Sequence, residues 1–396
     1  MNLNKLKENI KKCEIEYLVV TAILFLTVLV GILFLIFAPK QDFSEDENRV
    51  LESTPKITVQ GIEDGSFMKS IENYVGDHFM FRKNFVTLNT SVQLLCGKRD
   101  LGSNYSHTPA EGGVYFGDKN HIYEVLLPNK TDVFSRNVEA ITRFAEEIKI
   151  PFYFMPVPSG AQEQQENLPF SAPSHNQREE FDAIKSKEKG NIKVIDLFDT
   201  LNIKTGNDYY YKTDHHWNTY GAYEGYKALV EQMNISPAPK EDFEFKPIKE
   251  PFYGTLYSKA VYDKQEPDTV YLPYYKKQAV VTQQTGKKKW EGLFWKEYFT
   301  KKDKYSSFLG GNHSVDVVKN EDVKNNKKLL IIKDSYANSM IPFLATDFSE
   351  IHIIDLRYYN QNIYEYVKDN KITDAAAVYS IKQLCDVSVA NKLRIR

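Results

Sequence analysis

The residues best suited to chemistry lie near the middle of the chain, in the segment Thr213–Gly221, which reads TDHHWNTYG. A carboxylate, two imidazoles and an indole occupy four consecutive positions there, and aspartate and histidine are seldom stable in an apolar core without a specific role. In an extended segment, residues two apart point the same way, so Asp214 and His216 can share one face. An aspartate that orients a histidine, which in turn takes the proton of a nucleophile, forms two thirds of a Ser-His-Asp triad.

The missing nucleophile is predicted far downstream, at Ser335. The apolar run 328–333 is typical of a buried strand, and a helical pattern follows over 335–344. A serine on a sharp strand-to-helix turn is held exposed, beside helix-terminal N–H groups that can stabilise a developing oxyanion. We therefore expect Ser335 Oγ to lie about 2.6–3.2 Å from a ring nitrogen of His216. His215 is expected to point away from Ser335, and Trp217 to pack beneath the loop.

Two other interpretations of the cluster remain open. A metal site would use Asp214, His215 and His216, with His313 as a further ligand. Adjacent histidines diverge in an extended segment, however, and no second Cys/His group at ligand spacing accompanies them. Alternatively, the cluster is a polar turn with a capping aspartate. We expect neither a metal nor a cofactor, and the glycines of 112–117 lack the spacing of a dinucleotide or phosphate loop.

The amino-acid composition excludes some classes of protein for this chain. The 396 residues carry 51 basic and 53 acidic side chains, a net charge of −2, so no nucleic-acid-binding footprint is present. Aromatic residues reach 13%, which suits a large core and also a carbohydrate-binding groove. Three cysteines exclude a disulfide scaffold and allow at most a Cys96–Cys385 pair.

A membrane anchor is predicted near the N-terminus. Residues 17–38 form an uncharged apolar run, close to the roughly 20 residues that span a bilayer. Lysines 5, 7, 11 and 12 precede it, so residues 1–16 are expected in the cytoplasm, residues 17–38 in the membrane and the rest of this single-pass chain outside the cytoplasm. A cleaved signal peptide is the alternative, but its apolar core is usually shorter, and no small-x-small cleavage site follows.

The segment outside the membrane is expected to have two parts. Residues 39–110 indicate a stalk and a helical collar, and residues 111–396 an α/β domain. One parallel sheet should contain the strands 152–157, 192–197, 328–333 and 351–356, with a final strand at 375–381. Residues 240–310 interrupt this alternation with short β-like runs, which predict an antiparallel insertion, or flap, beside the site.

These segments together resemble the DHHW-motif proteins, which are similar to the AlgX/AlgJ-type, SGNH-hydrolase-like polysaccharide O-acetyltransferases. The resemblance runs from about residue 43 to the C-terminus. It is carried by DHHW itself (214–217), KDSY (333–336), NRVL (48–51), DHFMFR (77–82), GVYFG (113–117) and GGN (310–312). Where the family often has Gly-Asp-Ser at the serine turn, this chain has Lys333-Asp334-Ser335.

The resemblance implies an SGNH-hydrolase-like (flavodoxin-like) parallel sheet with flanking helices, with Ser335, His216 and Asp214 as nucleophile, base and orienting acid. It implies Asn312 as an oxyanion donor and places Trp217 and Tyr336 among the substrate-binding candidates. Three functions fit: an O-acyltransferase for a cell-envelope polysaccharide, a carbohydrate esterase, and a non-catalytic glycan-binding protein. A transferase outside the cytoplasm would receive its acyl group from a membrane-bound acyltransferase partner.

Overall fold

The computed structural model describes residues 3–101, 112–128, 131–277 and 281–395. The chain divides into two compact units, one made of residues 1–96 with 261–263 and the other of residues 97–260 and 264–396. The boundary predicted near residue 110 falls in 102–111, outside the described residues. Cys96 and Cys385 are both free thiols.

The first unit begins with the long helix α1. Its elements are α1 (Leu3–Phe37), β1 (Phe43–Ser44), β2 (Arg49–Val50), α2 (Val59–Glu63), α3 (Ser66–His78) and α4 (Arg82–Leu95). Within α1, the 23 residues Ile15–Phe37 have a mean hydropathy of 3.0, and the helix is long and apolar enough to cross a membrane. This agrees with a single-pass anchor, whose orientation stays a prediction.

Two of the segments that carry the family resemblance meet in this unit. Arg49, from NRVL, pairs with Asp77, from DHFMFR, at 2.5 Å. Arg82, which ends DHFMFR, pairs with Glu47 at 2.9 Å, and Glu47 also pairs with Arg49. The arginine and acidic residues of these segments therefore hold β2, α3 and α4 together.

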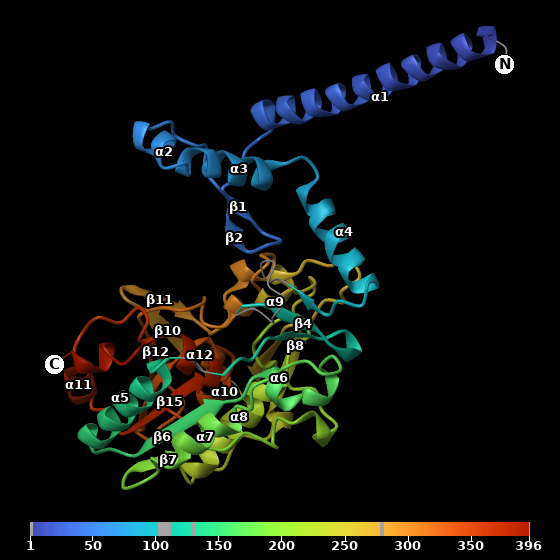
Figure 1. Cartoon of the computed structure of the whole chain (residues 1–396). Helices are drawn as coiled ribbons and strands as arrows, with labels where there is room; N and C mark the ends of the chain where they lie inside the picture. Colours follow the sequence, from blue (N-terminus) through green and yellow to red (C-terminus); the bar gives the residue numbers. More distant parts are fainter. Residues whose placement is uncertain (1–2, 102–111, 129–130, 278–280, 396) are drawn as a thin grey trace. The chain divides into compact units, whose positions relative to one another are not determined.

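The second unit is built on an eight-stranded sheet of order β11-β10-β12-β14-β13-β15-β6-β7 (Figure 1). Its strands are β6 (Phe152–Val157), β7 (Ile192–Val194), β10 (Val281–Thr285), β11 (Lys288–Glu291), β12 (Val315–Asn320), β13 (Lys328–Lys333), β14 (Glu350–Ile354) and β15 (Asp374–Ser380). The five strands from β14 to β7 are parallel, and β12, β10 and β11 extend the edge antiparallel. All four strands predicted to share a parallel sheet do share it.

Helices cover both faces of this sheet (Figure 1). They are α5 (Val133–Ile148), α7 (Arg178–Lys185), α8 (Thr219–Gln232), α10 (Ile341–Leu344), α11 (Ile363–Asp369) and α12 (Ile381–Asp386). Phe152 and Phe154 point to a core shared with α5, α7, α11 and α12, whereas Tyr153 and Met155 point to the core of α8 and α10. This alternation follows from the two-residue period of a strand and gives a three-layer α/β fold.

Smaller elements complete the unit. They are the sheet of β3 (Asp100–Leu101), β4 (Val114–Phe116) and β5 (Ile122–Glu124), the pair β8 (Phe243–Pro247) and β9 (Tyr271–Tyr275), and the helices α6 (Gly160–Glu163) and α9 (Thr255–Lys259).

The parallel strands β14-β13-β15-β6-β7 keep the flavodoxin-like 2-1-3-4-5 order when the count starts at β13, so this order is circularly permuted along the chain. Within 240–310, the antiparallel strands β10 and β11 extend the edge of the main sheet through β12. The structure corrects one expectation. The helix expected over 335–344 is a 3-10 helix, Ser335–Ser339, followed by the short α10, because Pro342 has no N–H to continue an α-helix.

Candidate functional site

Ser335 lies on a turn that is fixed to the centre of the sheet. It follows β13 directly and begins the 3-10 helix. One carboxylate oxygen of Asp334 accepts the N–H of Tyr336 at 2.9 Å, and the other accepts the N–H and hydroxyl of Ser380 at 2.7 and 2.8 Å. Because Ser380 ends the neighbouring strand β15, Asp334 locks the serine turn to the carboxyl edge of the sheet, where ligand sites of open α/β sheets lie.

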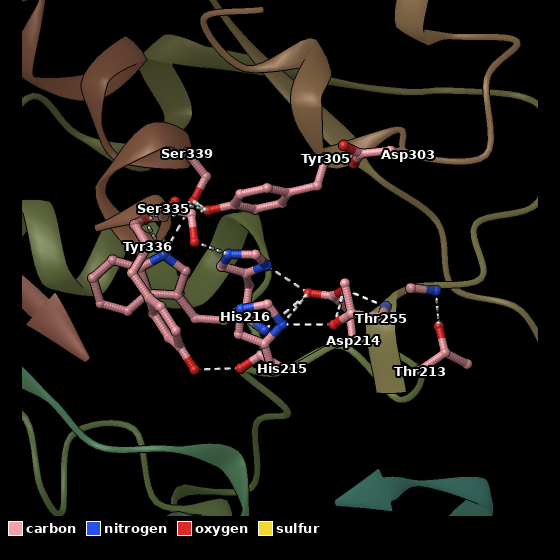
Figure 2. Close-up of polar contacts among 12 residues, drawn as sticks. Thr213, Asp214, His215, His216, Thr255, Asp303, Tyr305, Ser335, Tyr336 and Ser339 are labelled. Atoms are coloured by element: carbon pink, nitrogen blue, oxygen red, sulfur yellow. Dashed lines mark hydrogen bonds and ion pairs between the residues drawn. The ribbon is translucent and has the colours of Figure 1, made fainter. Parts of the chain in front are cut away.

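His216 lies between Ser335 and Asp214 (Figure 2). Its Nε2 is 2.7 Å from Ser335 Oγ, and its Nδ1 is 2.5 Å from Asp214 Oδ1. The backbone N–H of His216 also donates to Asp214 Oδ1, at 3.0 Å. The predicted convergence of these three side chains is therefore found, whereas their chemical roles stay a prediction.

Asp214 is held in its charged form. It is 3% exposed, and its Oδ2 accepts the N–H of Thr255 at 2.8 Å and the Thr255 hydroxyl at 3.1 Å. Burial by itself would raise the pKa of Asp214, but the two imidazoles and these hydrogen bonds outweigh it and hold the pKa well below its usual range. Gly254 leaves room for the carboxylate, because a side chain at that position would overlap Asp214.

The imidazole that contacts Ser335 is that of His216 and not that of His215, as predicted, but His215 does not diverge from His216. The two rings lie 3.8 Å apart, because residues 212–216 form bends rather than an extended strand. Nδ1 of His215 shares a hydrogen bond of 2.7 Å with the Thr255 hydroxyl. Burial lowers the pKa of His215 to about 4, and the neighbouring imidazole of His216 adds to this effect, so His215 is neutral at neutral pH.

Tyr305 covers the opposite face of the His216 ring. The two rings stack with centroids 3.8 Å apart and planes inclined by 10°. The Tyr305 hydroxyl donates to the carbonyl oxygen of Ser335 at 2.8 Å. One side chain thus contacts both the imidazole and the backbone of the serine turn (Figure 2).

Trp217 and Tyr336 support the site from beneath. They are 0% and 1% exposed. The indole N–H of Trp217 donates to the Tyr336 carbonyl at 2.9 Å, and the Tyr336 hydroxyl donates to the carbonyl of His215. These contacts tie the DHHW loop to the serine turn, as expected for Trp217. Direct substrate contact by either buried ring would require the site to open.

Lys333 is buried behind the serine turn. It is 1% exposed, and its Nζ donates to the side-chain oxygens of Asn312 and Asn338 at 2.6 and 2.7 Å. Burial lowers the pKa of Lys333 to about 8, although Asp355, 3.7 Å away, opposes the shift. Since Asn312 uses its oxygen on Lys333, its amide N–H₂ points elsewhere; its predicted role as an oxyanion donor stays a prediction.

The bent loop brings the candidate metal ligands close together. One atom each from Asp214, His215 and His216 can lie within 4.8 Å of the others, closer than an extended loop would allow. Both ring nitrogens of His216 are nevertheless engaged, by Asp214 and Ser335. His313 does not join the cluster, since its Nδ1 lies 3.1 Å from Asp316. These contacts favour the triad over a metal site.

A pocket of about 240 Å³ opens beside Ser335. It is lined mainly by polar side chains, among them Glu124, His215, Thr255, Lys259, Ser335 and Lys382. A substrate in this pocket would contact Ser335 from the side on which His215 and Thr255 lie.

Sequence reasoning missed Gly254, Thr255 and Tyr305. All three come from the region 240–310, where no hydrophobic period or motif marks them, and only the folded chain brings them to the DHHW loop. An isolated glycine-threonine pair or tyrosine in such a segment carries no signal of its own.

A protein-family model described as DHHW protein matches residues 101–354, more than half of the chain. The chain belongs to this family. The resemblance found in the sequence is thereby confirmed. A comparison with curated proteins found no match.

Similar solved structures include another DHHW protein. A DHHW family protein from Eubacterium siraeum DSM 15702 is 24% identical, with a TM-score of 0.62 over 71% of this chain and 94% of that one. Bacillus cereus PatB1 is 23% identical, with a TM-score of 0.58 over 70% of this chain and 98% of that one, and a second structure of PatB1 carries a sulfonyl adduct. The O-acetyltransferase domain of Pseudomonas putida AlgJ is 14% identical, with a TM-score of 0.45 over 72% of this chain and 99% of that domain.

Proposed function

We propose that this DHHW protein is a membrane-anchored, extracytoplasmic O-acyltransferase that acetylates a cell-envelope polysaccharide through an acyl-Ser335 intermediate. The observation that carries the proposal is the continuous chain of contacts from Ser335 Oγ to His216 Nε2, at 2.7 Å, and from His216 Nδ1 to Asp214, at 2.5 Å. A hydroxyl nucleophile, a base and a base-orienting carboxylate are arranged as acyl transfer requires. An SGNH-hydrolase-like assignment of the fold is part of the same proposal.

In the first half of the reaction, His216 Nε2 takes the proton of Ser335 as Oγ attacks the carbonyl carbon of the acyl donor. The donor's alkoxide leaves with that proton, and an ester of Ser335 remains. Asp214 stays ionised throughout and stabilises the positive charge that forms on His216.

The oxyanion of the tetrahedral intermediate needs donors close to Ser335. As the first residue of the 3-10 helix, Ser335 has a backbone N–H with no acceptor inside that helix. This N–H and the amide of Asn312 are the donors that we propose.

In the second half, a polysaccharide hydroxyl gives its proton to His216 and attacks the acyl-serine. Ser335 then recovers its proton, and the product is an O-acetylated sugar. Since acetyl-CoA is cytoplasmic, the acyl group would come from a membrane-bound acyltransferase partner, as the family resemblance implies. If water replaced the sugar, the same acyl-enzyme would make the protein an esterase.

The test uses the full chain in detergent with p-nitrophenyl acetate. We expect acetate on the peptide that contains Ser335, detected by mass spectrometry of an acid-quenched sample. Ser335→Ala and His216→Ala should each lower p-nitrophenol release about 10²–10⁴-fold, the usual contribution of a catalytic base. The double variant should be little worse than either, because the two residues act as one unit.

The control variant is Ser349→Ala, at a serine outside the site. Chelation with EDTA should leave the rate unchanged, whereas its loss would support the metal interpretation. Undiminished acetylation in Ser335→Ala would refute the proposal and leave the glycan-binding interpretation. Transfer of acetyl to an added oligosaccharide, rather than its removal from an acetylated one, separates the transferase from the esterase.

A further inference from the structure

The pocket beside Ser335 contains a carboxyl group that the proposed chemistry does not use. Glu124, the last residue of β5, is 8% exposed and lines the pocket with Ser335. Among the residues that the structure describes, none makes a hydrogen bond or ion pair to this carboxyl group. Buried polar groups nearly always have partners, so an unpaired one that faces a pocket needs an explanation.

Other buried carboxyl groups around the site are satisfied by the protein. Asp214 and Asp334 each accept several hydrogen bonds from the chain. Asp268 accepts the N–H groups of Lys212 and Thr213, each at 2.8 Å. Glu124 therefore differs from these three carboxyl groups, because its oxygens remain available to a ligand that enters the pocket.

The remaining lining indicates what could enter. Lys382 lies at the pocket and pairs with Asp386 at 2.8 Å, and Lys259 contributes a second ammonium group. Burial raises the pKa of Glu124, and Lys382 is the first of the nearby cations that oppose the shift. A wall of carboxyl, ammonium and hydroxyl groups suits a hydroxyl-rich ring, whereas a hydrocarbon acyl chain would leave these groups without partners.

We propose that this pocket is the acceptor subsite of the enzyme and that Glu124 holds a sugar ring in it by accepting a hydrogen bond from a ring hydroxyl. This inference rests on the proposed function. With one hydroxyl held by Glu124, another hydroxyl of the same ring attacks the acyl carbon of acyl-Ser335. The new carbon–oxygen bond forms to the sugar, the bond to Ser335 Oγ breaks, and the sugar's proton passes through His216 to Oγ.

The test compares sugar and simple alcohol acceptors on the full chain. Ser335 is acetylated with p-nitrophenyl acetate, and the rate of deacetylation is measured with equal concentrations of ethanol or a methyl glycoside. The panel contains the methyl glucoside, galactoside, mannoside and N-acetylglucosaminide. We expect at least one glycoside to exceed ethanol in wild type, and Glu124→Gln to reduce the ratio of that glycoside to ethanol about tenfold, because a neutral amide oxygen accepts a weaker hydrogen bond than a carboxylate does.

The matched control is Glu163→Gln, which makes the same change at a glutamate that is 2% exposed and does not line the pocket. It should keep the wild-type ratio. Should Glu124→Gln unfold at a lower temperature, deoxy analogues of the preferred glycoside answer the same question on wild type. One of these analogues should then react no faster than ethanol.

Two results would overturn the inference: no glycoside exceeds ethanol in wild type, or the ratio is unchanged in Glu124→Gln while every deoxy analogue reacts like the parent sugar. Failure of the proposed function has a different signature, because wild-type Ser335 would then carry no acetate at all.

Discussion

The rings of Tyr305 and His216 stack face to face, with centroids 3.8 Å apart. The hydroxyl of Tyr305 also donates a hydrogen bond to the backbone carbonyl of Ser335, the proposed nucleophile. An aromatic face attracts a cation, so this stacking favours the protonated imidazole that forms during acyl transfer. Tyr305 thus keeps His216 and Ser335 in their relative positions. It takes no part in bond formation or proton transfer and is therefore a positioning residue.

The two contacts of Tyr305 can be separated by substitution. Tyr305→Phe keeps the stacked ring and loses the hydrogen bonds of the hydroxyl to Ser335, Tyr336 and Ser339, so we expect kcat/KM for an acetyl ester to fall only about threefold to tenfold. Tyr305→Leu also removes the ring and should cost at least a further tenfold. It should lower kcat more than it raises KM, because the ring positions the base and not the substrate.

A purely structural role for Tyr305 would lower the unfolding temperature of both variants and leave the kcat of the folded protein unchanged. Tyr298→Phe, at another tyrosine of the same region, controls for general effects on packing. Equal values of kcat in Tyr305→Leu and wild type would contradict the positioning role.

Asp214 should act through His216 and not by its own titration. Because its pKa is held well below the usual range, Asp214 stays ionised at any pH at which the protein is active. We expect Asp214→Asn to lower kcat about 10²–10⁴-fold, since the protonated imidazole that forms during the reaction loses its counter-charge. Rates measured from pH 4 to 9 test this, because the loss should persist across a range in which Asp214 stays ionised.

His215 provides the comparison for Asp214. With its pKa lowered to about 4, it carries no charge through most of that range. His215→Gln should therefore lower kcat far less than Asp214→Asn does across that range. A large loss of kcat in His215→Gln and none in Asp214→Asn would reverse the assignment of the two neighbours.

The main parts of the fold and of the site could be predicted from the sequence, for physical reasons that can be named. The central strands are continuous apolar runs, and Asp214, His216 and Ser335 are residue types that a core does not favour. The order of the strands could not be read in the same way, because β15 enters the sheet between β13 and β6 through contacts distant in the sequence. Thr255 and Tyr305 were missed for the same reason.

The position of His215 beside His216 could not be predicted from the sequence, for a different reason. The alternation of side chains holds for an extended strand, and it selected the correct imidazole. The loop is bent, however, so the second ring lies beside the first and does not diverge from it. The direction of a side chain in a loop depends on backbone angles that the pattern of residues does not encode.

Lys333, the departure from the family's Gly-Asp-Ser turn, should stabilise the second unit. Lys333→Met removes the hydrogen bonds of the ammonium group to the oxygens of Asn312 and Asn338, and we expect it to lower the free energy of unfolding by about 2–3 kcal/mol at pH 7. Urea unfolding followed by tryptophan fluorescence measures this, since all three tryptophans lie in that unit. Lys368→Met, at an exposed position of α11, is the control and should change little.

The pH dependence of this difference tests the buried ammonium itself. The pKa of Lys333 is about 8 in the folded protein, below its ordinary value of 10.5, so between these pH values the unfolded chain binds more protons than the folded one. The contribution of Lys333 to stability therefore rises with pH across that window, by roughly 1 kcal/mol per pH unit. A difference between wild type and Lys333→Met that shrinks from pH 8 to 10 would contradict this.

The free thiol of Cys96 can report which side of the membrane the second half of the first unit faces. Cys96 is exposed, and the lysines before the apolar helix predict that residues after Pro39 lie outside the cytoplasm. Two single-cysteine variants of the full chain keep either Cys96 (Cys13→Ser/Cys385→Ser) or Cys13 (Cys96→Ser/Cys385→Ser). In spheroplasts, a membrane-impermeant maleimide should label the first variant, and the second only after permeabilisation. The reverse pattern would mean the opposite orientation, and loss of Cys13 from a shortened mature chain would mean that the helix is a cleaved signal peptide.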